Sequence, residues 1–442
     1  MWGHPTWTSD PRERPELVPH TVEGRIALRA ASRLIIVAIF FAPYALWRVS
    51  TEYFITISDL LFVLGTIVLA PAGAINLKPF GTWTPLWLMA FVTMLMGLLI
   101  GSLVNGDPWR WISASSQYCF GFAVLPFILM SADHERATRY GKAFLAGVFA
   151  MEAFGVLIYY FYGGSYEDHQ KIAFEFISGA GRLSAFLGDA NWNGAMIAMA
   201  LPFAMYFWAI GKVGNGATIV TLLVLLAALA ASGSFTGFGS GLAAITIFVI
   251  VAGGRASLKF VVGAMVGLAL VFAAGYRPPA VFQKRVATAF EEGDISQAGT
   301  FVGRLDLMEE AWQVVENTSF VGLGVDQYRK ISRQKAPVHN IYLLLWAEGG
   351  LMALIGWLTL LVVLAIGSAI STSYDRPAGA LGTAVLVTFI LFSCAAPHMY
   401  ARVWIVPLLV AMAIAFSATA VGPQTATNGY PDRTRQSRLI KR

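Results

Sequence analysis

The segment Ile341–Ile370, with the sequence IYLLLWAEGGLMALIGWLTLLVVLAIGSAI, decides the fold class of this chain. A helix needs roughly 20 apolar residues to cross about 30 Å of hydrocarbon, and this segment exceeds that length with Glu348 as its one charge. All 442 residues share this character, since 57% are apolar, 13% are charged and the mean hydropathy is +0.64. No soluble core could bury that much apolar surface, so the sequence predicts a polytopic membrane protein.

Twelve apolar segments recur along the chain and predict an all-α protein with about twelve transmembrane helices. The seventh and eighth are separated only by the tight turn Ser232–Gly237, and merging them would reverse the orientation of everything downstream. The twelve segments centre on Ile35–Trp47, Ile55–Ile75, Leu86–Val104, Ile112–Met130, Ala143–Tyr162, Trp192–Ile210, Ala217–Ala231, Phe238–Val251, Phe260–Gly275, Ile341–Ile370, Gly379–Ala395 and Trp404–Ala420.

One long polar segment, Tyr276–Val338, interrupts this series between the ninth and tenth predicted helices. Lys and Arg in short loops are held on the cytoplasmic side of a membrane. With both termini inside, eighteen Lys and Arg residues fall on the inner side, against five in the short outer loops. We therefore predict that Tyr276–Val338 is one large outer loop, which in a bacterial inner membrane faces the periplasm.

This topology predicts five regions along the chain. Residues 1–33 form a cytoplasmic N-terminal tail without a secretory signal, and residues 34–275 hold helices one to nine. Residues 276–338 form the periplasmic loop, and residues 339–420 hold the last three helices. Residues 421–442 form a cytoplasmic tail whose Thr, Gln, Pro and Arg content predicts disorder, with basic residues that can rest on anionic lipid.

Composition also bears on the classes of partner and cofactor. The net charge of +6 follows from the inner-side Lys and Arg, because the long polar segment has eight basic and eight acidic residues. No basic stripe interleaved with aromatic residues predicts nucleic-acid binding. Cys119 and Cys394 both lie in apolar segments, where small buried side chains are the better interpretation, and no spacing resembles a set of metal ligands. We therefore expect neither a metal nor another cofactor.

Histidine and arginine gather at the predicted outer ends of the helices. Arginine offers a forked, permanently charged set of donors, and histidine is a base near neutral pH. Such a cluster at one membrane face is what a phosphate-bearing substrate requires. The six residues are His169, Arg182, Arg304, His339, His398 and Arg402.

Four short motifs follow one another across the long polar segment and into the next helix. They are GRLDLMEEAW at Gly303–Trp312, FVGLGV at Phe320–Val325, VHNIYL at Val338–Leu343 and EGG at Glu348–Gly350. This order resembles the O-antigen ligase and Wzy-type polymerase superfamily, in which G-R-x(6)-A-W, G-x-G, H-N-x-Y-L and E-x-G span the large periplasmic loop and the following helix.

A fifth motif lies upstream, where RLSAFLGDAN at Arg182–Asn191 is similar to the R-L-S-G-x-x-G-x-P-N segment of that superfamily. The resemblance therefore covers about Gly181–Ala420. The chain departs from the pattern at Ala185, where Gly is favoured, and at Ala190, where Pro is common. It also has Ser234–Thr236 where many members have Ser-Arg-Gly, which removes one candidate donor.

The resemblance implies a GT-C-like glycosyltransferase of the bacterial inner membrane. Its reaction would be inverting, metal-independent transfer of a glycan from an undecaprenyl-pyrophosphate donor to a hydroxyl of an acceptor glycan. The product would be cell-surface polysaccharide, made by a ligase acting on lipid A core or by a polymerase, and the sequence does not separate the two. A polysaccharide chain-length regulator is a possible partner of either enzyme.

The same resemblance implies roles for individual residues. Arg182 and Arg304 would stabilise the pyrophosphate, and His339 would be the general base, a step worth roughly 10² to 10⁴ in rate. The alternatives are a lipid-headgroup anchor for Arg182, a solvated loop charge for Arg304 and an ordinary residue at a helix start for His339. Four further residues are predicted to contact substrate, although the first of them could instead cap a helix. These are Asn191, Asn340, Tyr342 and Arg402.

A transporter or flippase for a lipid-linked or anionic substrate is the alternative class. Transporters built from repeats have corresponding broken helices in two halves, and we find no similarity between Met1–Val220 and the rest of the chain. Glu348 lies nine residues after His339, about 180° around a helix, so we predict that the two residues do not face the same pocket.

Overall fold

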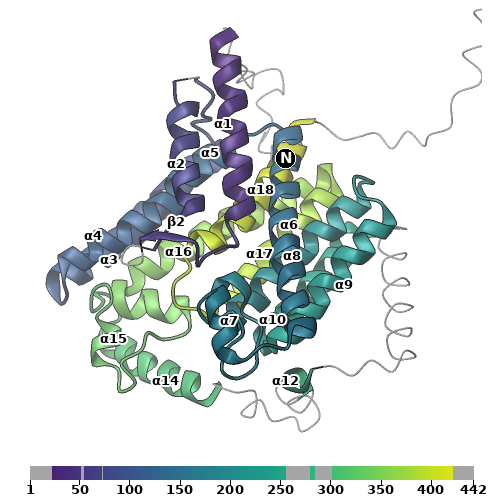
Figure 1. Cartoon of the computed structure of the whole chain (residues 1–442). Helices are drawn as coiled ribbons and strands as arrows, with labels where there is room; N and C mark the ends of the chain where they lie inside the picture. The colour runs from purple at the N-terminus through teal and green to yellow at the C-terminus, as the bar shows by residue number, and fades with distance from the viewer. Residues whose placement is uncertain (1–21, 51–53, 72, 255–278, 284–300, 422–442) are drawn as a thin grey trace, which may run out of the picture.

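The computed structural model describes residues 22–50, 54–71, 73–254, 279–283 and 301–421, so the ninth predicted segment, Phe260–Gly275, lies outside the described residues. The described chain is a bundle of helices with one two-stranded hairpin (Figure 1). The other eleven predicted segments each coincide with helical structure.

The elements up to α6 alternate long helices with short connections. They are α1 (Val22–Phe41), β1 (Arg48–Ser50), β2 (Ile55–Thr56), α2 (Ile57–Leu69), η2 (Gly81–Trp83), α3 (Thr84–Val104), α4 (Pro108–Cys119), the π-helix η3 (Phe120–Val124), α5 (Leu125–Leu129) and α6 (His134–Leu157). Strands β1 and β2 pair antiparallel. Since α1 begins at Val22, residues 22–33 of the expected N-terminal tail are helical.

The remaining elements include the described part of the large loop. They are the π-helix η4 (Ile158–Tyr162), α7 (Tyr166–Ile172), η5 (Ala185–Leu187), α8 (Ala190–Ala209), α9 (Asn215–Ser232), α10 (Phe235–Ala252), α12 (Ala280–Phe282), α14 (Phe301–Asn317), α15 (Tyr328–Ile331), α16 (Ile341–Tyr374), α17 (Arg376–Ser393) and α18 (Arg402–Val421).

Eight helical spans within the described ranges are long and apolar enough to cross a membrane. The protein is thus mostly helical and multi-pass, while the total of twelve spans stays a prediction. The eight are Gly81–Val104, Pro108–Leu129, His134–Tyr162, Asn215–Ser232, Phe235–Ala252, Ile341–Tyr374, Arg376–Ser393 and Arg402–Thr419.

The seventh and eighth predicted segments are two helices, as the sequence indicated. Helix α9 ends at Gly233, which has a left-handed φ of 53° that glycine adopts readily. Helix α10 then begins with Ser234 as its N-cap, whose side chain accepts a hydrogen bond from the Gly237 amide at 3.1 Å. A chain reversal of this kind needs no long loop, and it keeps the order of helix directions that the sequence predicted.

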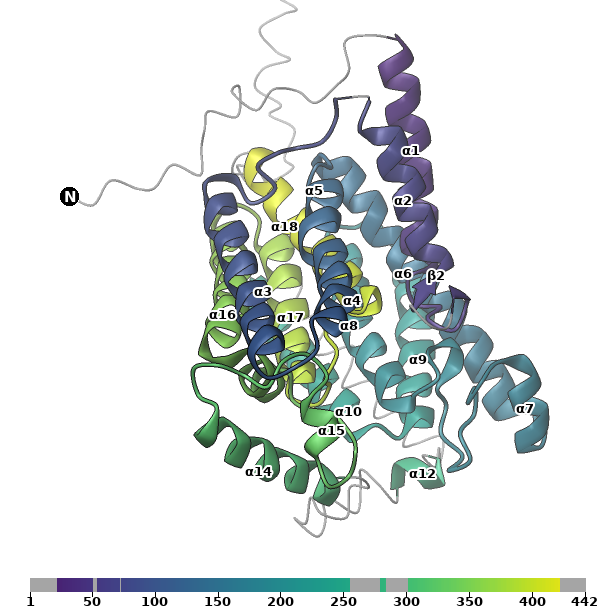
Figure 2. The same cartoon turned by 90° about the vertical axis from the view of Figure 1, so that its left-hand side faces the viewer.

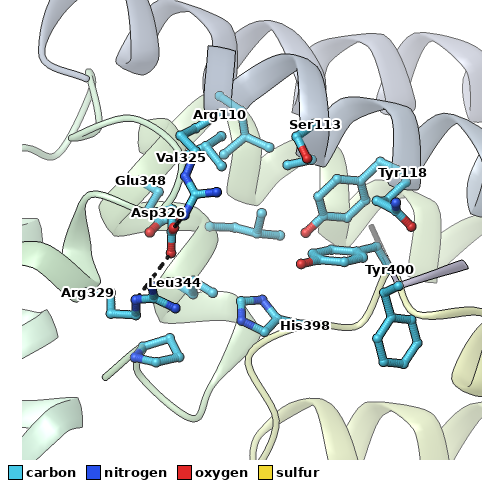
Figure 3. Close-up of a pocket in the computed structure, with 16 residues that line it drawn as sticks. Arg110, Ser113, Tyr118, Val325, Asp326, Arg329, Leu344, Glu348, His398 and Tyr400 are labelled. Carbon is cyan, nitrogen blue, oxygen red and sulfur yellow. Dashed lines mark hydrogen bonds and ion pairs between the residues drawn. The ribbon is translucent and has the colours of Figure 1, made fainter. Parts of the chain in front are cut away.

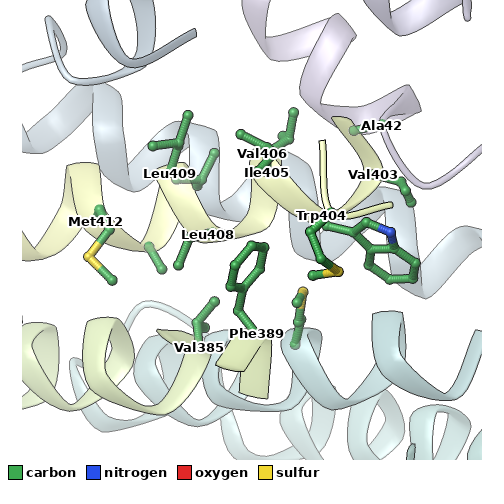
Figure 4. Close-up of a cluster of buried hydrophobic side chains, with 14 of the residues drawn as sticks. Ala42, Val385, Phe389, Val403, Trp404, Ile405, Val406, Leu408, Leu409 and Met412 are labelled. Atoms are coloured by element: carbon green, nitrogen blue, oxygen red, sulfur yellow. The ribbon is translucent and has the colours of Figure 1, made fainter. Parts of the chain in front are cut away.

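Helix α18 lies inside the bundle and organises its packing. Its sequence is apolar on every side, the pattern expected of a helix surrounded by other helices. Residues from Val403 to Ala418 are almost all buried. Trp404 packs against Phe392 of α17 with ring centroids 4.7 Å apart, and Figure 4 shows Leu408 and Phe389 in the same apolar layer.

Helix α16 is broken at Gly350, which has a φ of 67°. A segment of the large loop pairs with the backbone at this break, since the Leu323 amide donates to the Ala347 carbonyl at 2.9 Å and the Gly324 amide to the Glu348 carbonyl at 2.8 Å. A Cβ atom at Gly322 would overlap the Glu348 backbone. The G-x-G and E-x-G motifs therefore meet as one close backbone contact, which we call the α16 joint (Gly322–Gly324 and Ala347–Gly350).

The two ends of the bundle differ in their connections. Helices α7, α12, α14 and α15 lie together at one end, the lower end in Figure 2, which we call the loop face. Helix α1 starts at the opposite end, with Arg25, Arg29 and Arg33 within it. The motif residues that precede α8 and α16 belong to the loop face.

Candidate functional site

Arg182 is buried in the connection between α7 and α8. Its Nε donates to the Ser232 carbonyl at 2.8 Å, and its Nη2 donates to Oδ1 of Asn191 at 2.8 Å. The Ser234 hydroxyl donates to the same Asn191 oxygen at 3.2 Å. The guanidinium is thereby held against the start of α8 and the turn between α9 and α10, where the superfamily pattern departs in this chain.

Asp189 links the Arg182 region with His339, which lies at the end of the large loop. Its carboxylate caps α8 by accepting from the backbone amides of Asn191 at 2.7 Å and Trp192 at 3.0 Å. The same carboxylate is close enough to His339 to raise the pKa of that imidazole. Asp189, a motif position to which the sequence analysis gave no role, therefore connects the Arg182 region with His339.

His339 precedes α16 and is partly buried. Burial is the main cause that lowers the pKa of His339, and the charge of Arg304 on α14 lowers it further, against the opposite effects of Asp189 and of a hydrogen bond with the backbone of Pro337. Its Nδ1 is buried and has no hydrogen-bond partner among the described residues. The imidazole is therefore neutral near pH 7, which is the form that can accept a proton.

Asn340 and Tyr342 have partners inside the protein. Asn340 is the N-cap of α16, and its Oδ1 accepts from the amides of Tyr342 at 3.0 Å and Leu343 at 3.2 Å. The Tyr342 hydroxyl donates to the Ile390 carbonyl of α17 at 3.3 Å. These contacts fix the start of α16 next to His339, and they occupy Oδ1 of Asn340 and the Tyr342 hydroxyl.

Arg402 has a different environment at the start of α18. Its Nε donates to Oδ1 of Asp59 at 2.7 Å and its Nη2 to Oδ2 at 2.8 Å, so the pair is bidentate. The same guanidinium also donates to the Gln117 side chain and the Phe54 carbonyl. Arg402 is only 4% exposed, so these contacts join α18, α2 and α4 within the bundle.

A cavity of about 250 Å³ opens between α4, α15, the first turns of α16 and the segment 394–401 (Figure 3). Its polar side chains include two arginines, two carboxylates, two tyrosines and a histidine. They are Arg110, Tyr118, Asp326, Arg329, Glu348, His398 and Tyr400. His339 does not line this cavity, which agrees with the helix geometry that separated it from Glu348.

Titration at the cavity is governed by burial. Burial lowers the pKa of His398 to about 4, so its imidazole is neutral near pH 7. Burial, followed by the carboxylates of Asp326 and Glu348, raises the pKa of Tyr400 to about 12. Neither group exchanges a proton near neutral pH, which suits binding rather than acid–base chemistry.

The sequence analysis did not find most of this cavity. Arg110 was counted only as a loop charge, and the two tyrosines stand in apolar surroundings that carry no motif. Asp326, directly after the G-x-G motif, is the one signal that could have pointed to it. Within the described ranges, no group of three or more His, Cys, Asp or Glu residues is placed to hold a metal ion.

Comparison with protein families finds one match, to the O-antigen ligase family over residues 217–358. The matched region includes Arg304, His339 and Glu348, and it ends before Arg402. The match confirms the resemblance to the O-antigen ligase and Wzy-type polymerase superfamily, and it implies a glycosyl-transfer enzyme with lipid-linked glycan substrates at family level. It does not favour a transporter. No curated protein matches the chain.

Proposed function

We propose, from the O-antigen ligase family match, that this protein transfers a glycan from an undecaprenyl-pyrophosphate donor to a hydroxyl of an acceptor glycan, with inversion and without a metal. The observation that carries the proposal is that the charges of Arg304 and Asp189 both act on the partly buried His339, which precedes α16. A neutral imidazole beside a guanidinium supplies a base and a cation in one place, and these are the two groups that the reaction needs.

His339 is the general base in this proposal. It takes the proton of the acceptor hydroxyl as the oxygen attacks the anomeric carbon from the side opposite the leaving group. The bond between that carbon and the pyrophosphate oxygen breaks, and its electron pair leaves with the lipid pyrophosphate. Attack from the opposite side inverts the anomeric centre. The buried, unpartnered Nδ1 and the lowered pKa support this role, because they keep the imidazole unprotonated.

Arg304 and Arg182 stabilise the charge that develops on the leaving pyrophosphate. Arg304 acts beside His339, as its effect on the imidazole indicates. Arg182 is held by Ser232 and Asn191, so its guanidinium needs little reorganisation when charge develops. Direct substrate contact by Asn191, Asn340, Tyr342 and Arg402 stays a prediction, and their contacts inside the protein support positioning roles.

The loop face is the periplasmic side of a bacterial inner membrane in this proposal. Short loops and helix ends rich in Lys and Arg stay in the cytoplasm, and α1 begins at the opposite end with three arginines. An undecaprenyl carrier would reach the loop face from the outer leaflet. The sequence alone motivates this orientation, and labelling of single cysteines at each end of the bundle would test it.

The proposal is tested by incubating the purified protein with an undecaprenyl-pyrophosphate-linked repeat unit, with and without lipid A core, and resolving the products by mass. Growth of chains on the carrier without core identifies a polymerase, and transfer only with core identifies a ligase. We expect His339→Ala to reduce the rate by roughly 10² to 10⁴. His134→Ala, a histidine at the start of α6 bonded to Ser417, is the matched control and should retain activity.

Retained transfer by a correctly inserted His339→Ala protein would remove the general-base role. Absence of transfer by the wild-type protein with either acceptor would contradict the proposed reaction as a whole.

A further inference from the structure

The cavity beside the α16 joint has two walls of different chemistry. One wall is charged and comes from α4, α15 and α16, and the other is aromatic and comes from α4 and the segment 394–401 (Figure 3). None of the residues proposed to handle the pyrophosphate lines it.

The charged wall pairs its two arginines with one carboxylate. Asp326 pairs with Arg110 at 2.5 Å and more loosely with Arg329 at 3.8 Å. Glu348 is 7% exposed and turns its carboxylate into the cavity, with the backbone of Asp326 beside it. Both cations already have Asp326 as a partner, so the wall is not the cluster of free positive charge that a pyrophosphate requires. The wall instead offers both donors and acceptors to a neutral, polar ligand.

The aromatic wall consists of three rings in contact. Tyr118 and Tyr400 meet edge to face with centroids 5.0 Å apart, and the His398 ring lies 5.4 Å from that of Tyr400. Figure 3 shows both tyrosine hydroxyls directed towards the charged wall. Tyr118 is only 4% exposed. The two walls therefore present polar atoms that a ligand between them could contact.

A sugar ring fits these features. Its C–H faces can pack on aromatic rings, and its hydroxyls can donate to carboxylates and accept from guanidinium and phenol groups. The volume of about 250 Å³ lies just under the ~300 to 1,000 Å³ of sites for drug-sized ligands, which suits one or two sugar residues. A lipid tail would need a longer and more apolar groove.

The cavity is next to the proposed base. Pro337, two residues before His339, is part of its lining, as is Leu344 in the first turns of α16. His398, on the aromatic wall, is close enough for the charge of His339 to affect it. A glycan end bound in the cavity would thus lie near the segment that carries the imidazole, from which its reacting hydroxyl can extend towards His339.

We propose that this cavity binds the terminal sugar of the acceptor glycan, with Glu348 and the Tyr400 hydroxyl recognising its hydroxyl groups. This inference rests on the proposed function, because it assigns the acceptor half of that reaction to a site separate from the pyrophosphate. Arg402 also holds part of this cavity in place, because its hydrogen-bond partners Phe54 and Gln117 both line the cavity.

The first experiment measures glycan binding without turnover. The full-length protein in nanodiscs is titrated with two lipid-free probes, the repeat-unit oligosaccharide and the lipid A core oligosaccharide of the source cells, by saturation-transfer NMR. We expect one of them to bind, and Glu348→Gln and Tyr400→Phe each to weaken that binding about tenfold or more, as expected when a buried polar partner is lost. Both substitutions keep the side-chain shape.

The second experiment measures transfer with the same variants. We expect the acceptor KM to rise about tenfold or more while the donor KM and kcat change by less than about twofold. Glu316→Gln on the exposed side of α14 and Tyr374→Phe at the other end of α16 are the matched controls and should behave as wild type. Thermal unfolding in detergent checks that each variant remains folded.

The outcomes separate the cavity from the reaction. Transfer by wild type with an acceptor KM unchanged in both variants would overturn the acceptor site and leave the proposed function intact. Binding of neither probe to wild type would also overturn the site. Probe binding that both variants weaken, without transfer by wild type, would support a glycan site and contradict the proposed reaction alone.

Discussion

Arg402 and Arg304 are both arginines that the sequence predicted to lie at the outer membrane face, but their surroundings differ. Arg402 is buried and has Asp59 as a bidentate partner, with further contacts to α4 and the hairpin region. Arg304 is partly exposed, and its charge acts on a histidine with an unpartnered buried nitrogen. A saturated, buried ion pair stabilises an assembly of helices, whereas in the proposed function Arg304 and His339 act on the substrate. The comparison shows that partners and burial, rather than residue type, distinguish the two roles.

The largest expected effect comes from breaking the buried ion pair of Arg402 and Asp59. Arg402→Met leaves the Asp59 carboxylate buried without its partner, which should reduce the free energy of unfolding by about 3 to 5 kcal/mol. Arg139→Met, which removes an exposed pair with Glu135, should cost no more than about 1 kcal/mol. Chemical unfolding in detergent measures both. Combining Arg402→Met with Asp59→Asn should recover part of the loss, and an additive double variant would argue against coupling of the pair.

The next largest effect is on the rate of glycan transfer, when Arg304 is replaced. Arg304→Ala should reduce kcat by about 10² to 10³, the cost of removing one group that stabilises transition-state charge. The free energy of unfolding of this variant should differ from that of wild type by less than about 0.5 kcal/mol, because the Arg304 side chain is not part of the buried core. Single-turnover transfer rates and unfolding curves test the two halves of this expectation. Arg333→Ala, a neighbouring exposed arginine, serves as the control, and a loss of similar size there would point to general electrostatics.

The smallest effect is a shift in pH dependence. The protonated imidazole is disfavoured by burial and by Arg304, so the pKa of His339 lies below its ordinary value of 6.5 and the base stays active as pH falls below that value. Replacing Arg304 with Gln removes a positive neighbour, which should raise this pKa and move the acidic limb of kcat/KM to higher pH by about one unit or less. A pH profile measured for both proteins tests the sign. An unmoved limb would place Arg304 too far from His339 to matter, and a limb that moved to lower pH would contradict the sign of its effect.

Much of the fold could be predicted because helix formation in a membrane follows length and hydropathy. The segments that became α3, α16 and α18 are apolar over at least the length of a span, so their existence needed no knowledge of neighbours. The boundaries were harder. The second predicted segment extends over Ile55–Ile75, but α2 covers only Ile57–Leu69, because the capping box of Thr56 and Asp59 fixes its start.

The candidate site could be predicted only where motifs carried it. Arg182, Arg304 and His339 stand in recognisable patterns. Asp189 caps the helix that carries Asn191, the partner of Arg182, and both Asp189 and Arg304 affect the pKa of His339. The pairing of Asp59 with Arg402 joins residues 343 positions apart, which no local pattern encodes. The cavity likewise depends on α4 and the segment 394–401 coming together, so its existence is a property of the tertiary structure.

The α16 joint has a consequence for how the large loop can move. The amides of Leu323 and Gly324 are bonded to carbonyls that the break at Gly350 releases, and the Leu351 amide donates back to the Ser319 carbonyl at 3.0 Å. Freeing this part of the loop would expose unpaired carbonyls within a membrane helix, at a cost comparable to local unfolding of α16 itself. The loop segment from Ser319 to Gly324 and helix α16 are therefore one cooperative unit. Any gating that admits substrates must hinge outside Ser319–Leu351 rather than swing this segment open as a lid.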